Sequence, residues 1–459
     1  MSAGVPFSRI LIANRGEIAI RIMRACRELG IHTIALYSDV DKEALHVRYA
    51  DEAHPIGGTS ARESYLDIDK VLTIARQTRA DAIHPGYGFL SENPVFAEVC
   101  ADRGIVFIGP TAEALHSVGN KIAARHTAQK CGVPVVPGSI AGLNGHTEAA
   151  AIADTIGYPV LLKAAAGGGG KGMRTARTEA ELRQSLEVAA READHAFGDP
   201  SLYIEKLVDP ARHVEVQLLA DHFGNVIHLG ERDCSIQRRF QKVIEESPSP
   251  AVSEDLRRRI TTAAIQVAKA IGYRNAGTIE FLVDGDNFYF IEVNARLQVE
   301  HPVTEMVTGM DLVEEQILIA GGVPLRFKQE DISFQGSALQ ARIYAENPLY
   351  NFMPCPGFVS TVTEPSGPGI RIDSGVVAGS TVPIEYDGLL AKLVVWGRTR
   401  SKAIARMRGA LRDYEVSGVY TTIPFKRYVL ECPAFQSGNY DTGFVATIMD
   451  DWKRSCSRT

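Results

Sequence analysis

The chain has 459 residues, and its composition excludes several classes of protein. Hydrophobic residues make up 45% and charged residues 23% of the sequence, which is typical of a globular protein and not of a disordered one. At roughly 150 residues per domain, the length predicts about three domains. Lys+Arg 49 against Asp+Glu 55 gives a net charge of −6, so no bulk basic field attracts nucleic acid.

The cysteines and the amino terminus predict the compartment. Seven cysteines are scattered along the chain without a CxxC pair or a Cys/His ligand cluster. This pattern argues against a disulfide framework and structural zinc and fits a reducing cytoplasm. The first nine residues do not form a secretory signal, and no apolar run approaches the ~18 residues of a membrane span. We therefore expect a cytoplasmic protein without membrane association.

The first segment alternates short apolar runs with amphipathic ones. It predicts strands at 9–13, 33–37, 82–83 and 105–108, and helices at 16–29 and 65–78. Strands that alternate with helices of this length imply a parallel α/β sheet. We expect this Rossmann-like domain to cover residues 1–118.

The remaining two thirds change character. After a strand at 160–163 and a glycine-rich run, the middle segment predicts a helix at 179–193, a strand at 202–207, and an antiparallel pair, 213–220 and 226–232. From about residue 336 the chain mixes short strands with one clear helix at 402–414. We expect a second domain over 119–335 and a third, of mixed α+β type, over 336–450.

The glycine run Gly167–Gly170 is the first chemical signal. Consecutive glycines can turn several backbone N–H groups toward an anion, and Lys171 adds charge beside them. The run fails the Walker A pattern, because Ala165 takes the first glycine position and Gly172 replaces Ser/Thr after the lysine. A flexible surface linker is the alternative. The strand before the run and the helix after it favour a mobile phosphate lid.

A hairpin with paired glutamates is the stronger signal. The runs 278–283 and 288–293 flank a turn sequence at 284–287. With a three-residue loop, Glu280 falls opposite Glu292, whereas a two-residue loop puts the two carboxylates on opposite faces. Facing glutamates repel each other unless a cation lies between them. The pair therefore suits Mg²⁺ shared with a nucleotide.

Beyond the hairpin, polar residues continue at every second position. An antiparallel strand with one wet face is the ordinary interpretation. Against it, this row begins at a carboxylate and contains no Lys, Ser or Thr. It offers metal ligands, an anion-binding guanidinium and a candidate base, and Pro302 ends it: Glu292, Asn294, Arg296, Gln298 and Glu300.

Other candidates are weaker. In the basic stretch 232–242, Lys242 alternates with Phe240 and Arg238, so these would share one strand face that either binds an anion or is merely solvated. His213, in a strand context, is more typical of a hydrogen-bonded structural residue. Arg342 lies in an apolar segment and needs a partner if it is buried.

Five sequence blocks, in order along essentially the whole chain, resemble those of biotin carboxylase, a family of the ATP-grasp superfamily. They are 11–19 (LIANRGEIA), 84–93 (HPGYGFLSEN), the glycine run 167–170, 231–239 (ERDCSIQRR) and 294–302 (NARLQVEHP). The resemblance implies an amino-terminal α/β domain, an ATP-grasp domain with a mobile glycine lid over about 136–207, and a mixed α+β carboxy-terminal domain.

The resemblance also implies roles for individual residues. ATP would contact Lys121, Lys163, Gly169, Gly170, Glu205, Lys206, Leu207, Val208, His213, Gln237, Glu280 and Glu292. Mg²⁺ or Mn²⁺ would be held by Glu280, Glu292 and Asn294. Bicarbonate and biotin would be bound by Tyr87, Gly88, Lys242, Arg296, Gln298, Val299, Glu300 and Arg342. Among these, Glu300 would be the base and Arg342 would stabilise the enolate-like oxygen of biotin, with Lys242 and Arg296 as the other catalytic residues.

Some features depart from the family pattern. Phe240 stands where many members carry His or Asn, and Ala166 replaces a glycine that often opens the lid. The sequence contains no Met-Lys dipeptide, so we expect biotin to arrive on a separate carrier protein. The resemblance further implies a carboxyltransferase partner and a homodimer.

The expected reaction is ATP-dependent carboxylation of biotin through carboxyphosphate. Acetyl-CoA is the expected final acceptor, with propionyl-CoA, other acyl-CoAs and pyruvate as alternatives. Two rival functions remain open from the sequence: an ATP-grasp ligase with another acceptor, and a non-catalytic nucleotide-binding component of an assembly.

Overall fold

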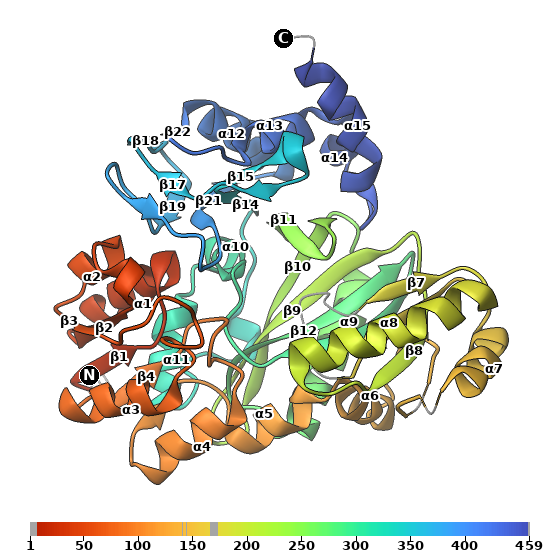
Figure 1. Ribbon diagram of the computed structural model, residues 1–459, viewed down its shortest axis with the longest axis horizontal. Coiled ribbons are helices and arrows are strands. Elements are labelled where there is room, and N and C mark those ends of the chain that lie inside the picture. Colours follow the sequence, from red (N-terminus) through yellow and green to blue (C-terminus); the bar gives the residue numbers. More distant parts are fainter. Residues whose placement is uncertain (1–6, 140, 144, 166–172, 458–459) are drawn as a thin grey trace.

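The computed structural model describes residues 7–139, 141–143, 145–165 and 173–457. The predicted lid residues Gly169 and Gly170, and Ala166, lie outside these residues. Figure 1 shows an amino-terminal part in red and orange, a central part in yellow to green, and a carboxy-terminal part in blue above both. Within the described ranges, no helix is both long and apolar enough to cross a membrane.

The amino-terminal part is a five-stranded parallel sheet flanked by helices, as the alternating pattern predicts. The strand order is β3-β2-β1-β4-β5, and every neighbouring pair is parallel. The strands are β1 Arg9–Ile12, β2 His32–Tyr37, β3 Glu52–Pro55, β4 Ala82–His84 and β5 Val106–Phe107. The helices are α1 Gly16–Glu28, α2 Leu45–Tyr49, α3 Ile68–Gln77, α4 Pro94–Asp102 and α5 Ala112–Gly119.

Capping residues set where these helices begin. The side chain of Asp67 accepts the N–H of Lys70, so α3 starts at Ile68 and not at the expected residue 65. Asn93 caps α4 in the same way, through the N–H of Phe96. The loop between β4 and α4, which carries Tyr87, therefore ends at a capped helix.

A small antiparallel sheet, β7-β6-β8, forms a unit at the right of Figure 1. Helices α7 and α8 pack on it around a core of their own that includes Leu162, Leu182 and Ile204. This unit contains most of the described residues of the expected lid region. Its elements are α7 His146–Ile156, β6 Val160–Ala164, β7 Arg174–Ala176, α8 Glu179–Phe197 and β8 Leu202–Lys206, and α6 Lys121–Lys130 precedes them in the chain.

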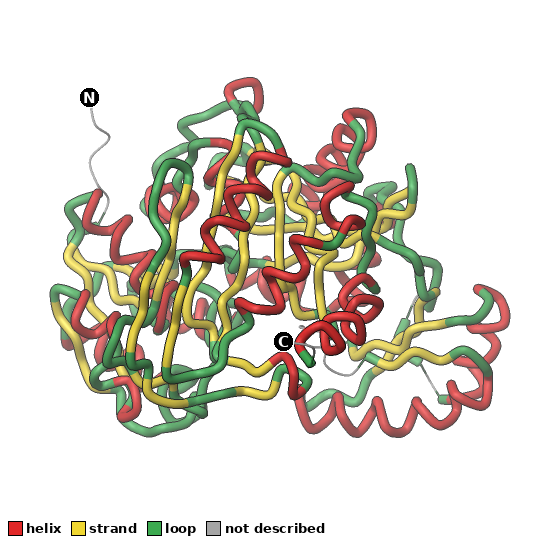
Figure 2. The backbone as a smooth tube through the Cα atoms, turned by 90° about the horizontal axis from the view of Figure 1, so that it is seen from above, coloured by secondary structure: helices red, strands yellow, loops and turns green. Residues whose placement is uncertain are grey.

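An eight-stranded sheet runs from the central part into the carboxy-terminal part without a break at residue 336, the expected domain boundary. Its order is β13-β12-β9-β10-β11-β14-β21-β19. Figure 2 shows helices lying across its long strands. Helix α9 packs on β9 and β10, and α12 packs on β14 and β21. The strands are β9 Arg212–Ala220, β10 Val226–Arg238, β11 Gln241–Ser247, β12 Asn275–Asp284, β13 Asn287–Asn294, β14 Ser337–Tyr344, β19 Ile370–Ser374 and β21 Leu389–Gly397.

The last third contains more helices than the sequence pattern indicates. The expected helix at 402–414 is α12, and α13 and α15 follow it around a core that includes Phe425 and Trp452. Pro424 accounts for the missed α13, because proline in a sequence usually indicates that a helix is interrupted, whereas here it lies in the first turn, where it is tolerated. The α-helices that follow the small unit are α9 Glu254–Ala270, α10 His301–Thr308, α11 Leu312–Ala320, α12 Arg400–Asp413, α13 Ile423–Glu431, α14 Pro433–Ser437 and α15 Phe444–Cys456. The remaining short strands are β15 Glu346–Asn347, β16 Met353–Pro354, β17 Gly357–Phe358, β18 Thr361–Thr363, β20 Thr381–Val382 and β22 Glu415–Ser417.

Candidate active site

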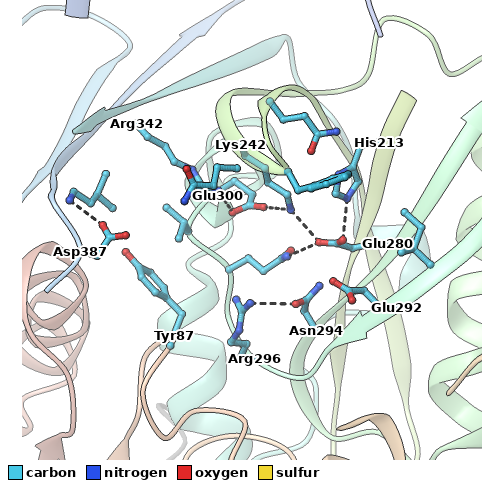
Figure 3. A pocket seen from close by; sticks show the side chains of 18 of the residues that line it. Tyr87, His213, Lys242, Glu280, Glu292, Asn294, Arg296, Glu300, Arg342 and Asp387 are labelled. Carbon is cyan, nitrogen blue, oxygen red and sulfur yellow. Dashed lines mark hydrogen bonds and ion pairs between the residues drawn. The ribbon is translucent and has the colours of Figure 1, made fainter. Parts of the chain in front are cut away.

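A cavity of about 760 Å³ lies where the three parts of the chain meet (Figure 3). Its wall brings together residues that are far apart in the sequence, from the first helix to the carboxy-terminal sheet. All the predicted site residues that the structure describes line it: Tyr87, Gly88, Lys121, Lys163, Glu205, Lys206, Leu207, Val208, His213, Gln237, Lys242, Glu280, Glu292, Asn294, Arg296, Gln298, Val299, Glu300 and Arg342.

The hairpin β12–β13 places the two predicted metal-binding glutamates opposite each other, by an unexpected route. Asp284 pairs with Asn287, so the loop has two residues, which is the second of the two alternatives that the sequence left open. Such a loop alone would leave Glu280 and Glu292 on opposite faces. A β-bulge at Ile291 shifts the register by one residue and restores the pairing of Glu280 with Glu292. The expected carboxylate pair is confirmed.

The two carboxylates are surrounded by hydrogen-bond donors. Glu292 forms an ion pair with Lys121 at the start of α6. Glu280 accepts hydrogen bonds of 3.0 Å from Lys242 Nζ and from Gln298 Nε2, and His213 Nε2 lies 2.9 Å from it. Burial alone would raise the pKa of Glu280, but Lys242 and His213 outweigh burial and hold this pKa well below its ordinary value. The carboxylate is therefore ionised.

Lys242 is at the centre of the site, on a different strand from the one expected. The chain turns at Arg239 and Phe240, both with positive φ, so Lys242 lies on β11 and pairs with Gln237 of β10. The expectation that Arg238, Phe240 and Lys242 share one strand face is therefore wrong. The turn instead aims the Lys242 ammonium into the cavity.

Three buried carboxylates surround the Lys242 ammonium. Its Nζ lies 2.5 Å from Glu215, 3.0 Å from Glu280 and 2.5 Å from Glu300. Burial by itself would lower the pKa of this amine. The neighbouring acidic groups, which include Cys234 and these carboxylates, raise the pKa of Lys242 well above its ordinary value. Lys242 is a fixed positive charge.

The predicted base Glu300 lies between two cations. One carboxylate oxygen accepts from Lys242, and the other accepts from Arg342 Nη2 at 2.9 Å. Arg342 also donates through Nε to Glu245 of β11, which supplies the partner that a buried arginine needs. Burial would raise the pKa of Glu300, but Lys242 and Arg342 hold this pKa well below its ordinary value. The side chain is a buried, ionised carboxylate.

The polar row that follows the hairpin is not a strand along its whole length. Strand β13 ends at Asn294, a loop follows, and Glu300 is the residue that precedes α10. The ordinary interpretation of this row as a strand therefore holds only as far as Asn294, and the loop beyond it still directs its polar side chains to the cavity. Arg296 donates to Asn294 Oδ1 at 3.1 Å and to Glu92 Oε2 at 2.9 Å. The contact with Glu92, from the amino-terminal part, was not predicted.

A second unpredicted element is the guanidinium of Arg232, which is fully buried behind the site. It makes five hydrogen bonds within the fold, and two of them hold the site residues Glu215 (2.6 Å) and Gln298 (2.8 Å). The sequence showed Arg232 only as part of a basic stretch. The sequence could not indicate this role, because the hydrogen-bond partners of Arg232 come from four separate segments of the chain.

The other end of the cavity lies beside the small unit of β6 and β8. Lys163 Nζ lies 2.5 Å from Glu205, and Arg125 of α6 pairs with the same carboxylate. Lys206 behaves differently, because its ammonium donates to the carbonyls of Gly157 and Tyr158. Lys163 thus presents a charge to the cavity, while the Lys206 ammonium binds backbone carbonyls.

A buried charge pair between Glu17 and Lys392 links Tyr87 to the carboxy-terminal part of the chain. The Tyr87 hydroxyl donates to Glu17 of α1. Glu17 lies 2.8 Å from Nζ of Lys392, a fully buried residue of β21. Burial is the main reason that the pKa of the Tyr87 hydroxyl is well above its ordinary value. Tyr87 therefore remains a neutral hydrogen-bonding group in the wall.

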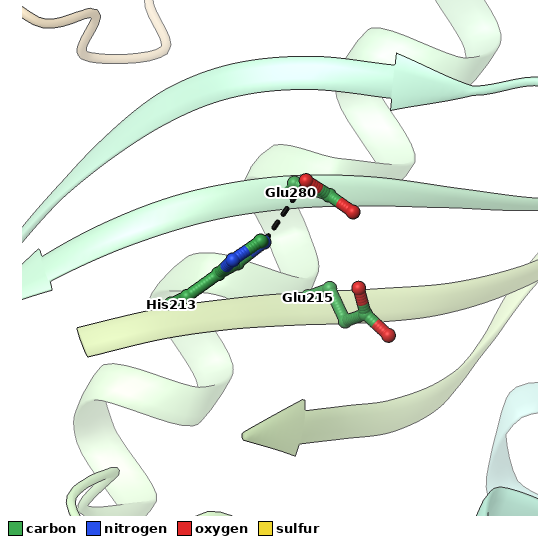
Figure 4. Close-up of side chains that lie close together, drawn as sticks. All are labelled: His213, Glu215 and Glu280. Carbon is green, nitrogen blue, oxygen red and sulfur yellow. Dashed lines mark hydrogen bonds and ion pairs between the residues drawn. The ribbon is translucent and has the colours of Figure 1, made fainter. Parts of the chain in front are cut away.

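Three sets of the described residues could hold a divalent cation. In one of them, Glu215, Cys234 and Glu300, the Lys242 ammonium already contacts both carboxylates. His213, Glu215 and Glu280 lie close together (Figure 4), but the Lys242 ammonium contacts both of these carboxylates and takes the place of a cation. The predicted set, Glu280, Glu292 and Asn294, offers oxygen donors from two paired strands, which Mg²⁺ and Mn²⁺ prefer. Each residue of this set offers an oxygen, whereas the set in Figure 4 includes the imidazole nitrogen of His213. The hairpin set fits such an ion better.

Three known protein families match successive parts of the chain. Residues 6–115 match the biotin carboxylase N-terminal domain, and residues 120–328 match the ATP-binding domain of the carbamoyl-phosphate synthase L chain. Residues 340–447 match the biotin carboxylase C-terminal domain. The chain is 53% identical to biotin carboxylase 1 of Bacillus subtilis over 96% of this chain and 98% of the relative. It is 52% identical to a pyruvate carboxylase subunit from Methanothermobacter thermautotrophicus, over 98% of this chain and 90% of the relative.

Solved structures give the same answer. A biotin carboxylase complex from Campylobacter jejuni superimposes with a TM-score of 0.94 at 49% identity, covering 96% of this chain and 99% of the other. The biotin carboxylase domain dimer of the Hydrogenobacter thermophilus 2-oxoglutarate carboxylase, with MgADP, ADP and bicarbonate, has a TM-score of 0.95 at 46% identity. In this second comparison, 97% of this chain and 98% of the other are covered.

Together with the cavity and its cations, these matches define an ATP-grasp ligase. The chain belongs to the biotin carboxylase family. Its activity is that of the family, the ATP-dependent carboxylation of biotin as part of a biotin-dependent carboxylase.

Proposed function

We propose that Glu300 is the base that starts the reaction. It takes the proton of bicarbonate, and the resulting carbonate oxygen attacks the γ-phosphorus of ATP. A phosphorus–oxygen bond forms to give carboxyphosphate, while the bond from the γ-phosphorus to ADP breaks. The observation that carries this proposal is the buried, ionised Glu300 carboxylate between Lys242 and Arg342. A positioned base of this kind typically contributes about 10²–10⁴ to the rate.

We assign the cations of the cavity to the charge that moves during this transfer. Lys121, Lys163, Lys242 and Arg296 are paired with carboxylates here, so phosphate and bicarbonate oxygens would replace those carboxylates as partners. Preorganised cations in a site of low dielectric stabilise developing charge effectively. Mg²⁺ or Mn²⁺, held by Glu280, Glu292 and Asn294, would neutralise charge on the phosphates. The surrounding residues Glu205, Lys206, Leu207, Val208, His213 and Gln237 would hold the nucleotide.

The second half of the proposed reaction takes place at the Arg342 end of the cavity. Carboxyphosphate breaks its carbon–oxygen bond to give CO₂ and phosphate, and the phosphate takes the proton of the ureido nitrogen of biotin. Arg342 then stabilises the ureido oxyanion while the nitrogen attacks CO₂. Tyr87 and Gly88 form the facing wall, and Gln298 and Val299 lie between the two ends.

We further propose a separate biotin carrier protein, a carboxyltransferase partner and a homodimer. The dimer is supported by the Hydrogenobacter thermophilus neighbour, which was solved as one. Acetyl-CoA is the proposed final acceptor. Relatives include a 2-oxoglutarate carboxylase domain and a component of a pyruvate carboxylase, so the acceptor needs its own test. Co-purification of the carboxyltransferase and assay of its acceptor would supply it.

The central test is ATP hydrolysis measured with and without bicarbonate, and with and without free biotin. We expect hydrolysis that requires bicarbonate and that biotin stimulates. Loss of the bicarbonate requirement would overturn the assignment of Glu300 as its base. Absence of any stimulation by biotin would overturn the assignment of the Arg342 end as the biotin site.

A further inference from the structure

Thr422, just before α13, uses its hydroxyl in an unusual way. A threonine in this position ordinarily accepts an N–H from the first turn of its own helix, but Thr422 makes no such bond. Its Oγ1 instead accepts the N–H of Tyr344 at 3.1 Å and donates to the carbonyl of Arg342 at 3.3 Å. The backbone N–H of Thr422 also donates to the carbonyl of Tyr344 at 3.1 Å. Thr422 therefore acts as a partner of strand β14.

This contact lies where β14 loses its regular neighbour. Strand β11 pairs with β14 only as far as Ala341. On the other side β21 follows to Tyr344, but with an irregular register after Ile343. The segment that leads into the cavity is thus held on one side by Thr422. Arg342 and Tyr344, which line the cavity, are the residues on either side of Ile343.

Lys426 completes the arrangement from the first turn of α13. Lys426 is 1% exposed, and its Nζ donates to Thr422 Oγ1 at 2.7 Å. A hydroxyl has one donor and two acceptor sites, so Arg342, Tyr344 and Lys426 together use all three of Thr422. Lys426 thereby fixes the direction in which the hydroxyl points.

The position of Lys426 is unfavourable for stability in two respects, its burial and its place in the first turn of a helix. Burial, together with the charge of Arg342, lowers the pKa of Lys426 to about 7 against the opposing effect of Glu346 and Glu245. A cation in the first turn also opposes the helix dipole. Residues that are unfavourable in their local context are common at functional sites, where the rest of the fold compensates for them.

We propose that Thr422 and Lys426 are positioning residues that set the alignment of Arg342 toward biotin. They touch no substrate and act through the backbone of β14. This inference rests on the proposed role of Arg342 in the second half-reaction. It assigns a function to residues that the predicted active site does not contain.

The test compares variants that keep or remove the hydrogen-bonding groups. Thr422→Val removes the hydroxyl and keeps the shape, whereas Thr422→Ser keeps the hydroxyl. Lys426→Met and Lys426→Gln form the second pair, in which only Gln can still donate. Thr399→Val is the control, because Thr399 caps α12 in the same part of the chain by an ordinary bond to the N–H of Lys402. Each variant is assayed for kcat and KM with free biotin, for bicarbonate-dependent ATP hydrolysis without biotin, and for thermal melting.

We expect Thr422→Val and Lys426→Met to lower kcat/KM for biotin by about tenfold, the effect of one lost hydrogen bond. Hydrolysis of ATP without biotin should change less than biotin turnover. Thr422→Ser and Lys426→Gln should recover most of the loss. Thr399→Val should lower the melting temperature and leave biotin turnover intact.

The inference is overturned if Thr422→Val keeps wild-type kcat/KM for biotin, or if Thr399→Val lowers it equally. If Thr422→Val does not fold, the Lys426 pair decides in the same way. A wild-type enzyme that biotin does not stimulate would instead contradict the proposed function, so the two failures are distinguishable.

Discussion

Replacing Glu300 by Gln keeps the shape of the side chain and removes the charge and the basicity that we assign to it. Glu300 is 1% exposed, and its carboxylate is bound by Lys242 and Arg342. Each cation keeps another carboxylate in the variant: Lys242 keeps Glu215 and Glu280, and Arg342 keeps Glu245. The expected loss of unfolding free energy is therefore about 1–3 kcal/mol, the cost of altered buried hydrogen bonds. It should stay below the ~3–5 kcal/mol expected when a buried charge is left alone.

The effect on activity should be much larger. Loss of a general base lowers the bicarbonate-dependent rate of ATP hydrolysis by about 10²–10⁴. Binding of MgATP, measured by calorimetry, should persist. Glu246→Gln is the matched control, since Glu246 is as deeply buried, lies on β11 and pairs with Arg400, yet does not line the cavity. This control should lose stability and keep turnover.

Two results would refute this reasoning. If Glu300→Gln kept more than about a tenth of the wild-type rate, Glu300 would not be the base, because general bases contribute far more than that. If Glu246→Gln lost turnover as severely as Glu300→Gln, the loss would reflect disruption of the sheet and not the chemistry.

Three further predictions concern stability and metal binding. Arg232→Met should lower the unfolding free energy, measured by urea denaturation, by about 3 kcal/mol, because it removes a buried charge that hydrogen-bonds several segments. An unfolding free energy equal to that of the wild type would show that this guanidinium is not needed for stability. Glu280→Gln should raise the Mg²⁺ concentration needed for half-maximal turnover by about tenfold or more, measured by MgCl₂ titration at fixed ATP; an unchanged requirement would place the ion elsewhere. Burial lowers the pKa of His46 to about 4 and that of His228 to about 4. Between pH 6.5 and 4 the unfolded chain therefore binds protons that the folded chain does not, and the unfolding free energy should fall as the pH drops. His228→Gln should flatten this dependence, and an equally steep curve in that variant would contradict the assignment.

Much of the fold could be predicted because its patterns are local. The parallel amino-terminal sheet follows from short apolar strands that alternate with amphipathic helices, and the structure confirms it. The helices α13 and α15 were not predicted. Pro424 obscures the helical pattern of α13, and the apolar faces of both helices pack against residues that are distant in the sequence. The continuity of the large sheet across residue 336 was also invisible, because β14 pairs with β11 only through long-range contacts.

The sequence by itself determined the chemical content of the site. It supplied the glutamate pair, the row of polar residues up to Glu300 and the family resemblance, because residue types and spacing are properties of the chain alone. The tertiary structure decided how these groups face each other. A single-residue bulge made Glu280 and Glu292 oppose each other after a loop that would have separated them.

The same holds for the cations. A turn at 239–240 placed Lys242 on the returning strand, among three carboxylates from three other segments. Arg232 and Thr422 gained their roles only from partners distant in the sequence. Side-chain direction in a sheet reverses with every one-residue shift, and buried charges depend on whichever groups the fold brings near them. Composition and spacing alone therefore identify the groups, while register and long-range contacts give each group its role.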